Sequence, residues 1–563
     1  MFLISIAAAS LFYLAWSLIA LEINYRRASS MGIPLVRLPI DPLNIFFQVF
    51  ESHAWKILDR LPIPLPTFAQ YARRGWYFKD KATSHLKYGP IWALVTPRDI
   101  HILLSDAEAV HEVFARRNDF VRPNKMYKLL EVYGPCLPTA DQPNWARQRK
   151  ILATPFNENV MSFVWNETIH QTLELIECWT DPQTIEKGIL SVARDSRTLS
   201  LNIMAAIGFR RRFKFESSTG SEDIELVEGK MLDYRDALSI VLDNSILLML
   251  LPPQYLVSTW LPKKLRKIGK AAADFKSHMV RMLNEETASL NRGEKGSGSL
   301  MTSFVRALDA HSKEDSTSTA GHKGLSIDEI FGNMFVINFA GHDTTANTLA
   351  FTMLYLAIHP DIQDWVAEEV REVMQGSKPQ DWVYNELFPQ LKRCRAILLE
   401  TLRLHPPILA LPKWTNEHPQ NLRVGDRTIV IPPYSGVSPS VLASHTLPQY
   451  WPEPLVWKPS RWIVRETPES EESVYTPPEG TYYPWSDGPQ ICLGVRFSQV
   501  EFVAILACLL RDHRVSVVSD GTETEEVITA RVIEVIENCD FQMLLRMIDP
   551  DKITLRCQPI KAE

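Results

Sequence analysis

The sequence lacks the cysteine patterns of structural metal sites, and it has no excess of basic residues. Its seven cysteines are scattered over 563 residues without a Cys-x-x-Cys pair or a zinc or iron–sulfur spacing. An odd, scattered set favours a reducing compartment. Lys and Arg number 60 against 66 Asp and Glu, a formal net charge of -6. Such a chain has no cationic surplus for a phosphate backbone, so we expect no nucleic-acid partner.

Charge is also missing from the amino terminus. Phe2 to Leu21 contains no charged residue and has about the twenty positions that span hydrocarbon, while Arg26 and Arg27 follow it. We therefore predict a transmembrane anchor over residues 1–25 with the downstream chain in the cytosol. A cleaved signal peptide is the alternative, although a short apolar region and a cleavage site are lacking.

The remaining chain divides into a linker and one large domain. Prolines at 34, 39 and 42 predict an extended stalk and linker over residues 26–60. Residues 61–563 are then the catalytic domain, which is long enough to bury a core and to enclose a cofactor. We see no internal repeat.

Helical spacing dominates the domain, and strand patterns are few. Ile91 to Ser105 predicts a strand pair with Thr96-Pro97-Arg98 as its turn, and Gly425-Asp426 predicts a hairpin turn. Strand patterns return near Val515 and Phe541. Residues 106–407 predict helices, interrupted by a polar surface loop over residues 293–324. The predicted fold class is mainly α with a smaller antiparallel β portion that comes from both ends of the chain.

The strongest motif is WSDGPQICLG at residues 485–494, which is followed by an apolar helical pattern. It sets Cys492 on a turn at a helix N-terminus, where the helix dipole and amide donors favour a thiolate. Gly488 and Gly494 would let the backbone approach a flat ligand closely. An inert buried cysteine is the alternative.

A second motif, AGHDTT at residues 340–345, lies inside a long predicted helix. Ser326 and Glu329 form a capping-box pattern at its start, and His359-Pro360 ends it after about 30 residues, on the order of 45 Å. Asp343 beside Thr344 is an acid next to an alcohol, which suits proton delivery. On its own the motif is also compatible with an ordinary polar helix face.

The two motifs together resemble the cytochrome P450 family, in which the first is the cysteine-ligand loop and the second the oxygen-activation motif. Trp485 stands where the family usually has phenylalanine, and Gln490 where it usually has a basic residue. The GPQICLG form and the long carboxyl-terminal extension resemble fungal members. The resemblance implies a cytochrome P450 fold and a haem b held through the Cys492 thiolate. It places Trp485, Gly488, Gln490 and Gly494 at the cofactor, and makes Asp343 and Thr344 the catalytic pair.

Two weaker patterns occur in the family's order. Glu400 and Arg403 are one helical turn apart, and with Arg461 they resemble the family's buried structural network. Trp145 and Arg149 are four residues apart and resemble its contacts to the haem propionates, with Lys413 as a further contact. Solvated surface cations are the alternative for the basic residues.

The function implied is that of a haem-thiolate monooxygenase that activates O2 and oxidises a small lipophilic molecule, a secondary metabolite such as a terpenoid or polyketide. Its electrons come from NADPH through a separate NADPH-cytochrome P450 reductase, because no flavin or iron–sulfur segment is fused to the chain. Arg147, Lys150 and Arg496 are candidate docking cations. The predicted location is the endoplasmic reticulum membrane, with membrane lipid as a partner.

Two further regions bear on the substrate, and two other functions are compatible with a haem-thiolate site. The apolar stretch 239–261 predicts a substrate entrance that dips into lipid, or else a buried helix end. Phe339, Ala340 and Leu409 line the pocket by resemblance.

A haem-thiolate isomerase or dehydratase and a non-enzymatic haem sensor are the alternative functions. The Asp343-Thr344 pair disfavours both.

Overall fold

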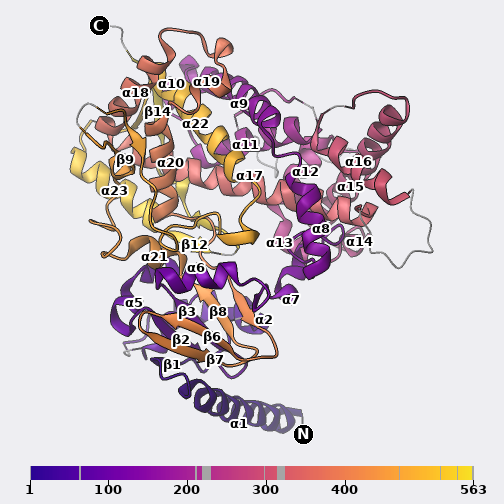
Figure 1. Ribbon diagram of the computed structural model, residues 1–563, viewed down its shortest axis with the longest axis vertical. Helices are drawn as coiled ribbons and strands as arrows, with labels where there is room; N and C mark the ends of the chain where they lie inside the picture. Colours follow the sequence, from indigo (N-terminus) through magenta and orange to yellow (C-terminus); the bar gives the residue numbers. More distant parts are fainter. Residues whose placement is uncertain are drawn as a thin grey trace.

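The computed structural model describes residues 2–42, 44–62, 65–209, 212–217, 230–296, 298–312, 324–467, 470–519, 521–541 and 543–560. A helical body stands above a small layer of strands, as Figure 1 shows. This arrangement confirms a mainly α fold with a smaller β portion. The β portion was predicted to be antiparallel, but its main sheet is mixed, since two of the neighbouring strand pairs run parallel.

The helices fall into long and short groups. The long helices are α1 (Phe2–Ser29), α2 (Ile45–Leu58), α6 (Ala107–Ala115), α8 (Gln142–Ala153), α9 (Glu158–Trp179), α11 (Val192–Phe209), α12 (Tyr234–Asp243), α15 (Lys263–Asn291), α16 (Leu300–Ser312), α17 (Ile327–Ala357), α18 (Pro360–Met374), α20 (Lys392–Leu404), α22 (Val495–Asp512) and α23 (Glu525–Glu537). The short helices are α3 (Phe68–Tyr71), α4 (Trp76–Asp80), α5 (Thr83–Tyr88), α7 (Asn124–Tyr127), α10 (Pro182–Lys187), α13 (Ser245–Leu250), α14 (Pro253–Leu256), α19 (Tyr384–Leu387) and α21 (Val441–Thr446).

The main sheet has six strands in the order β1-β2-β3-β8-β5-β4. Its strands are β1 (Leu35–Arg37), β2 (Ile91–Val95), β3 (Ile100–Leu104), β4 (Phe120–Val121), β5 (Lys413–Thr415) and β8 (Gly436–Pro439). The predicted pair β2 and β3 is confirmed as antiparallel, with Ile91 opposite Leu104. The side chain of Thr96 closes its turn by accepting the amide hydrogen of Asp99 at 2.9 Å.

The other strands form separate two-stranded pairs. They are β6 (Gln420–Val424) with β7 (Arg427–Ile431), β9 (Ile463–Val464) with β10 (Ser473–Val474), β11 (His513–Val517) with β14 (Leu555–Pro559), and β12 (Cys539–Phe541) with β13 (Leu545–Met547). The predicted hairpin at Gly425-Asp426 and the strands near Val515 and Phe541 are therefore confirmed.

Two loop-like predictions differ from the structure. Residues 26–60 are not an extended stalk, because α1 continues to Ser29, β1 pairs in parallel with β2, and α2 follows. Met31, Ile33, Leu38 and Trp55 are buried there, so burial of apolar side chains outweighs the local bias of the prolines. In the predicted loop 293–324, α16 covers residues 300–312, and residues 313–323 lie outside the described part.

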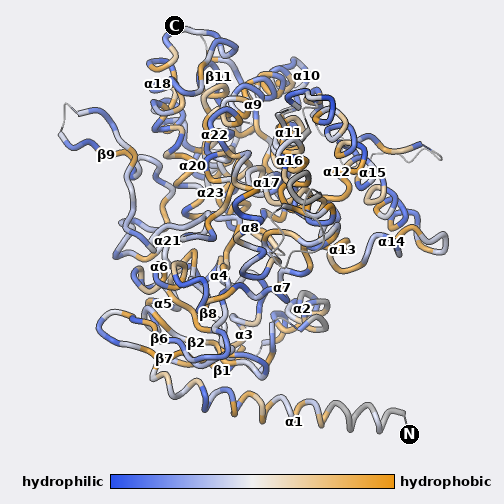
Figure 2. The backbone as a smooth tube through the Cα atoms, turned by 45° about the vertical axis from the view of Figure 1, so that its right-hand side comes forward, coloured by the Kyte–Doolittle hydropathy of each residue, from blue (hydrophilic) through white to orange (hydrophobic). Residues whose placement is uncertain are grey.

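Helix α1 lies along the outer edge of the strand layer (Figures 1 and 2). Leu21 and Ala28 are buried, and the Asn24 amide donates to the carbonyl oxygen of Thr96 at 3.1 Å. A membrane-crossing helix is not found among the described residues, since none combines the length and the apolar content that a span requires. The predicted transmembrane anchor is thus not confirmed.

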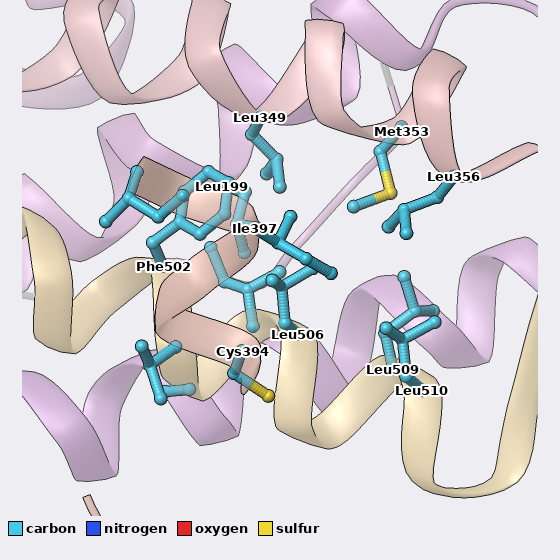
Figure 3. Close-up of a cluster of buried hydrophobic side chains, with 14 of the residues drawn as sticks. Leu199, Leu349, Met353, Leu356, Cys394, Ile397, Phe502, Leu506, Leu509 and Leu510 are labelled. Carbon is cyan, nitrogen blue, oxygen red and sulfur yellow. The ribbon is translucent and has the colours of Figure 1, made fainter. Parts of the chain in front are cut away.

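Helix α17 runs through the centre of the helical body (Figure 1). It has 31 residues, as the pattern predicted, and its capping box is confirmed: Ser326 Oγ accepts the Glu329 amide hydrogen at 3.1 Å, and Glu329 Oε2 accepts that of Ser326 at 2.9 Å. In Figure 3, Leu349 and Met353 of α17 face the buried side chains of α20 and α22. The core therefore fixes α17 relative to α22, the helix that follows Cys492.

The predicted network of Glu400, Arg403 and Arg461 is present. The fully buried Glu400 carboxylate accepts hydrogen bonds from Arg403 Nε and Nη2, both at 2.9 Å, and from Arg461 Nε at 3.0 Å. Trp462 Nε1 and the Lys458 amide donate to the same carboxylate. The network ties α20 to the segment before the Cys492 loop.

We predict that Glu400→Gln lowers the free energy of unfolding by about 3–5 kcal/mol, because it leaves two buried guanidinium groups without a counter-charge. Denaturant unfolding, monitored by tryptophan fluorescence, measures the change. Glu453→Gln is the matched control, since Glu453 pairs with Lys458 at the exposed surface. Wild-type stability of the Glu400 variant would contradict the assigned bracing role.

Candidate active site

The loop before α22 closes on itself through its backbone. The Trp485 carbonyl oxygen accepts the Cys492 amide hydrogen at 2.9 Å, and the Gly488 carbonyl oxygen accepts that of Ile491 at 3.1 Å. The Gly494 amide donates to Cys492 Sγ at 3.3 Å. The Cys492 side chain is exposed although α22 is almost wholly buried. The loop thus presents an accessible sulfur at the start of a fixed helix.

Several groups influence the pKa of the Cys492 thiol. Desolvation raises the pKa of the Cys492 thiol, while the Gly494 amide and the charges of Arg149 and Arg122 lower it. Together these influences leave the pKa of the thiol above its ordinary value. A metal ion bound to the sulfur would favour the thiolate, and the thiolate at the helix start stays a prediction.

The two loop glycines have different roles. Gly488 has a φ of +64°, and a Cβ there would lie 2.8 Å from the Phe114 carbonyl oxygen. Glycine at this position therefore lets the loop approach the end of α6, and the prediction that it also admits a flat ligand stays a prediction. A Cβ at Gly494 would meet Cys492 Sγ at 3.7 Å, in ordinary contact. The absence of a side chain at Gly494 keeps space beside the sulfur.

Trp485 and Gln490 link the loop to its surroundings. Trp485 Nε1 donates to Ser498 Oγ of α22 at 3.1 Å. Gln490 Oε1 accepts a hydrogen bond from Lys413 Nζ at 2.5 Å. Gln490, which stands where the family usually has a basic residue, therefore holds the Lys413 side chain at the loop.

Three cations meet at the backbone of this loop. Arg149 Nη1 donates to the Ile491 carbonyl oxygen at 2.6 Å, and Arg122 Nη2 to that of Gln490 at 3.1 Å. Lys413 is the third; burial, aided by the charge of Arg122, lowers its pKa to about 7. Within the described residues none of the three forms an ion pair with a carboxylate.

Arg122 was missed by sequence analysis, because its place depends on strand register. Val121 of β4 pairs with Trp414 of β5, so one further step places Arg122 opposite Lys413. Trp145 is buried on the same face of α8 as Arg149, with the Arg117 guanidinium 4.6 Å above its ring. An accessible sulfur beside cations that lack carboxylates fits a haem, whose propionates would supply the missing charge.

The acid and the alcohol of α17 have different surroundings. Asp343 is fully buried: its Oδ1 accepts from Arg197 Nη2 at 2.9 Å, and its Oδ2 from Arg546 Nη2 at 2.6 Å. Thr344 is only partly buried, and its hydroxyl donates to the Ala340 carbonyl oxygen at 2.6 Å. The threonine competes for a helix carbonyl as predicted, whereas the acid is held by residues far away in sequence.

The ion pairs keep Asp343 charged. Burial is the largest single influence and raises the pKa of its carboxyl, but His342, Arg197 and Arg546 together leave the pKa below the ordinary value. Arg197 also pairs with Asp243 at 3.0 Å. The acid therefore belongs to a network that joins α11, α12, α17 and β13.

Comparison with known proteins decides the family. The family model for cytochrome P450 matches residues 61–537. The chain belongs to the cytochrome P450 family.

Its relatives are monooxygenases, and the chain is an oxidoreductase of this kind. It is 27% identical to a cytochrome P450 monooxygenase of Arthrobotrys oligospora over 96% of this chain and 95% of the relative. It is 29% identical to the phomenoic acid biosynthesis cluster cytochrome P450 monooxygenase of Leptosphaeria maculans, over 87% of each. The crystal structure of the cytochrome P450DA heme domain superimposes with a TM-score of 0.64 at 19% identity, over 89% of this chain and 97% of that structure.

Some residues assigned by family resemblance have other environments in this cytochrome P450. Of the predicted pocket residues only Ala340 is exposed; Leu409 is buried, and Phe339 stacks on Phe335. Among the predicted docking cations, Arg147 is paired with Glu329, while Arg496 donates to Tyr384. Lys150 alone remains exposed.

We predict that Gly488→Ala lowers the free energy of unfolding by about 1–3 kcal/mol, because alanine is strained at positive φ and its Cβ meets the α6 backbone. Thermal unfolding of the isolated protein measures the effect. Gly494→Ala is the matched control, because φ at Gly494 is −87° and its contact is ordinary. Equal losses in both variants would refute the proposed contact with α6.

Proposed function

We propose that this cytochrome P450 binds haem b through the Cys492 thiolate and oxidises a small lipophilic substrate with O2. The observation that carries the proposal is the accessible Cys492 sulfur beside three cations that lack carboxylate partners. When bound, the haem supplies an iron that activates O2, and its thiolate ligand favours O–O cleavage. The outcome is hydroxylation, epoxidation or desaturation.

Arg122, Arg149 and Lys413 are assigned to the haem propionates, with Trp145 beside them. The forked guanidinium groups favour bidentate binding of carboxylates, and Lys413 gives a point charge that Gln490 directs. Because these groups are already tethered to the loop backbone, they bind the propionates with little reorganisation. Neutralising them removes the cost of burying cations without partners.

Thr344 and Asp343 are assigned to proton delivery. The half-buried Thr344 hydroxyl is the group that meets the reacting oxygen, and the ionised Asp343 sets the field behind it. An isomerase or a haem sensor needs no such supply of protons. This pair therefore favours monooxygenation over the two alternatives.

The substrate is assigned to secondary metabolism, as a terpenoid or polyketide. The support is the relative from the phomenoic acid biosynthesis cluster. Near Thr344, the accessible residues of α17 include the small residues Ala340 and Gly341. Pocket walls of this kind suit an apolar molecule that is held by shape.

Electrons are assigned to an NADPH-cytochrome P450 reductase, and the location to the cytosolic side of the endoplasmic reticulum membrane. Apolar side chains exposed on α1 and beyond α13 give surfaces for lipid. They are Leu11, Phe12, Leu14, Trp16, Leu18, Ile19 and Ile23 on α1, and Leu250, Leu251, Tyr255, Val257 and Trp260 from the end of α13 onward. The second group lies in the predicted entrance region 239–261, where a lipophilic substrate would enter from the bilayer, while α1 would serve as the anchor.

We expect microsomes that contain this chain and a reductase to consume NADPH and to incorporate oxygen from O2 into an apolar precursor, with product mass as the readout. Cys492→Ser should abolish the thiolate-type absorption band of the reduced carbon monoxide complex, because serine provides no thiolate. Cys508→Ser, a buried cysteine later in α22, is the matched control and should retain the band. An unchanged band in Cys492→Ser would refute the assignment of the ligand.

We expect Thr344→Ala to divert electrons from product to peroxide and to lower the product formed per NADPH by roughly 10–100-fold, because the proton donor near the oxygen is lost. Asp343→Asn should slow turnover and change its solvent isotope effect. Thr348→Ala is the matched control, since its hydroxyl makes the same bond to the helix backbone one turn later. Full coupling in Thr344→Ala would contradict the assigned role.

A further inference from the structure

A cluster of oxidisable aromatic rings lies next to the Cys492 loop and takes no part in the proposed substrate oxidation. Its buried centre is the pair Trp451 and Trp462, whose ring centroids are 5.3 Å apart. The Tyr482 ring packs against both, at 4.7 Å from Trp462 and 6.0 Å from Trp451. Indole and phenol rings lose one electron far more readily than a phenyl ring. Rings of this kind in contact can therefore pass an electron from one to the next.

The inner end of the cluster is Trp485, a residue of the Cys492 loop itself. Its carbonyl oxygen accepts the Cys492 amide hydrogen at 2.9 Å, and its side chain packs against the cluster that contains Trp451 and Trp462. The family usually has phenylalanine at this position, which is much harder to oxidise. The tryptophan therefore gives this chain an electron donor in the loop of the cysteine ligand.

The outer end of the cluster is Tyr475, which follows β10. The register of β9 with β10 sets Val474 opposite Ile463, so the next step places Tyr475 opposite Trp462. The two ring centroids are 6.5 Å apart, and the Tyr475 amide donates to the Trp462 carbonyl oxygen at 2.8 Å. Unlike Trp462, Tyr475 is partly exposed, and Figure 1 shows β9 at the outer side of the helical body beside α20. The rings therefore lead from the loop to the surface.

Hydrogen bonds and charge favour Trp462 as the intermediate ring. Its Nε1 donates to the Glu400 carboxylate at 2.9 Å, so a base is in place to take the N–H proton when the ring loses an electron. The surroundings of Trp451 are less favourable. Its Nε1 donates to the Ser444 carbonyl oxygen, and the Arg403 guanidinium lies 5.3 Å over its ring. A cation at the ring face opposes the removal of an electron.

We propose that Trp485, Trp462 and Tyr475 form an electron-transfer path that gives the protein a second activity, the reduction of peroxide by a small reductant at the surface. The proposal rests on the proposed haem binding, because the oxidised haem is the electron acceptor. Each H2O2 takes up two electrons and two protons and becomes two molecules of water. In two successive steps, Tyr475 sends one electron inward and releases its phenolic proton to solvent. After each step the reductant returns a hydrogen atom to Tyr475.

The surface position of Tyr475 defines the class of reductant. It is a water-soluble donor of hydrogen atoms, such as ascorbate, which reacts without entering the site of the apolar substrate. The Glu400 carboxylate returns the N–H proton to Trp462 when an electron from Tyr475 refills its ring, so the path ends each step unchanged. The path therefore removes oxidising equivalents when no apolar substrate is bound.

Electron paramagnetic resonance of the purified haem protein, frozen soon after mixing with H2O2, tests the path without substrate turnover. We expect a tyrosyl radical, which a spin trap should locate at Tyr475 by peptide mass mapping. Tyr475→Phe should remove this radical. Tyr434→Phe is the matched control, because Tyr434 is exposed at the surface in the loop before β8 and lies outside the path. A tyrosyl radical that survives unchanged in Tyr475→Phe would overturn the proposal.

A pair of tryptophan variants tests the order of the path. Trp485→Phe should lower the yield of the Tyr475 radical per haem roughly tenfold, because phenylalanine raises the barrier of the first electron transfer. Trp451→Phe is the matched control, since Trp451 is buried in the same cluster but is not assigned to the path. It should retain most of the radical. Equal losses in both variants would refute the assigned order.

Oxidation of ascorbate driven by H2O2 measures the second activity. Tyr475→Phe should lower its rate roughly tenfold, while the product formed per NADPH from an apolar precursor stays unchanged. The absorption band of the reduced carbon monoxide complex separates the two proposals. Wild-type protein with a thiolate-type band but without a radical at Tyr475 would refute the path alone, whereas protein without that band would refute the proposed function.

Discussion

The arrangement of the site depends on three cations that meet at the loop of Gln490 to Cys492 and that pair with no carboxylate in the part of the chain that the structure describes. Two of them, Arg122 and Lys413, come from neighbouring strands of the sheet, and Arg149 comes from α8. To bring them to the loop, the sheet must be held against the helical body. Because a cation away from water is costly without a counter-charge, a ligand with negative charge would stabilise this position.

The Glu400 network is a cluster of charged residues with a structural role. There one carboxylate accepts five hydrogen bonds, and its two arginines give their remaining hydrogens to backbone carbonyl oxygens. Every group has a partner inside the protein. The cluster at Cys492 differs, because its cations have carbonyl oxygens as partners and no carboxylate among the described residues. The presence of a carboxylate therefore separates the structural cluster from the ligand-binding one.

Local patterns predicted those parts of the structure that local interactions decide. The capping box fixed the start of α17, and the turn at Thr96 fixed β2 and β3. The sequence could not indicate that Asp343 meets Arg197 and Arg546, which are 146 and 203 residues away. Arg122 was missed for the same reason, since only the pairing of β4 with β5 brings it to the loop. The high pKa of Cys492 arises from desolvation, which depends on the packed fold rather than on the glycines beside it.

The two buried acids nearest to this chemistry illustrate how environment divides their roles. Asp343 pairs with two arginines, so its ionised form is favoured and it acts through its electrostatic field. Burial raises the pKa of the Glu501 carboxyl to about 8, with the Ser200 hydroxyl beside it, so its neutral form is favoured. Helix α11 contacts both, because Arg197 and Ser200 lie one turn apart on it. A shift of α11 would therefore alter the field at one acid and the hydrogen bonding of the other together.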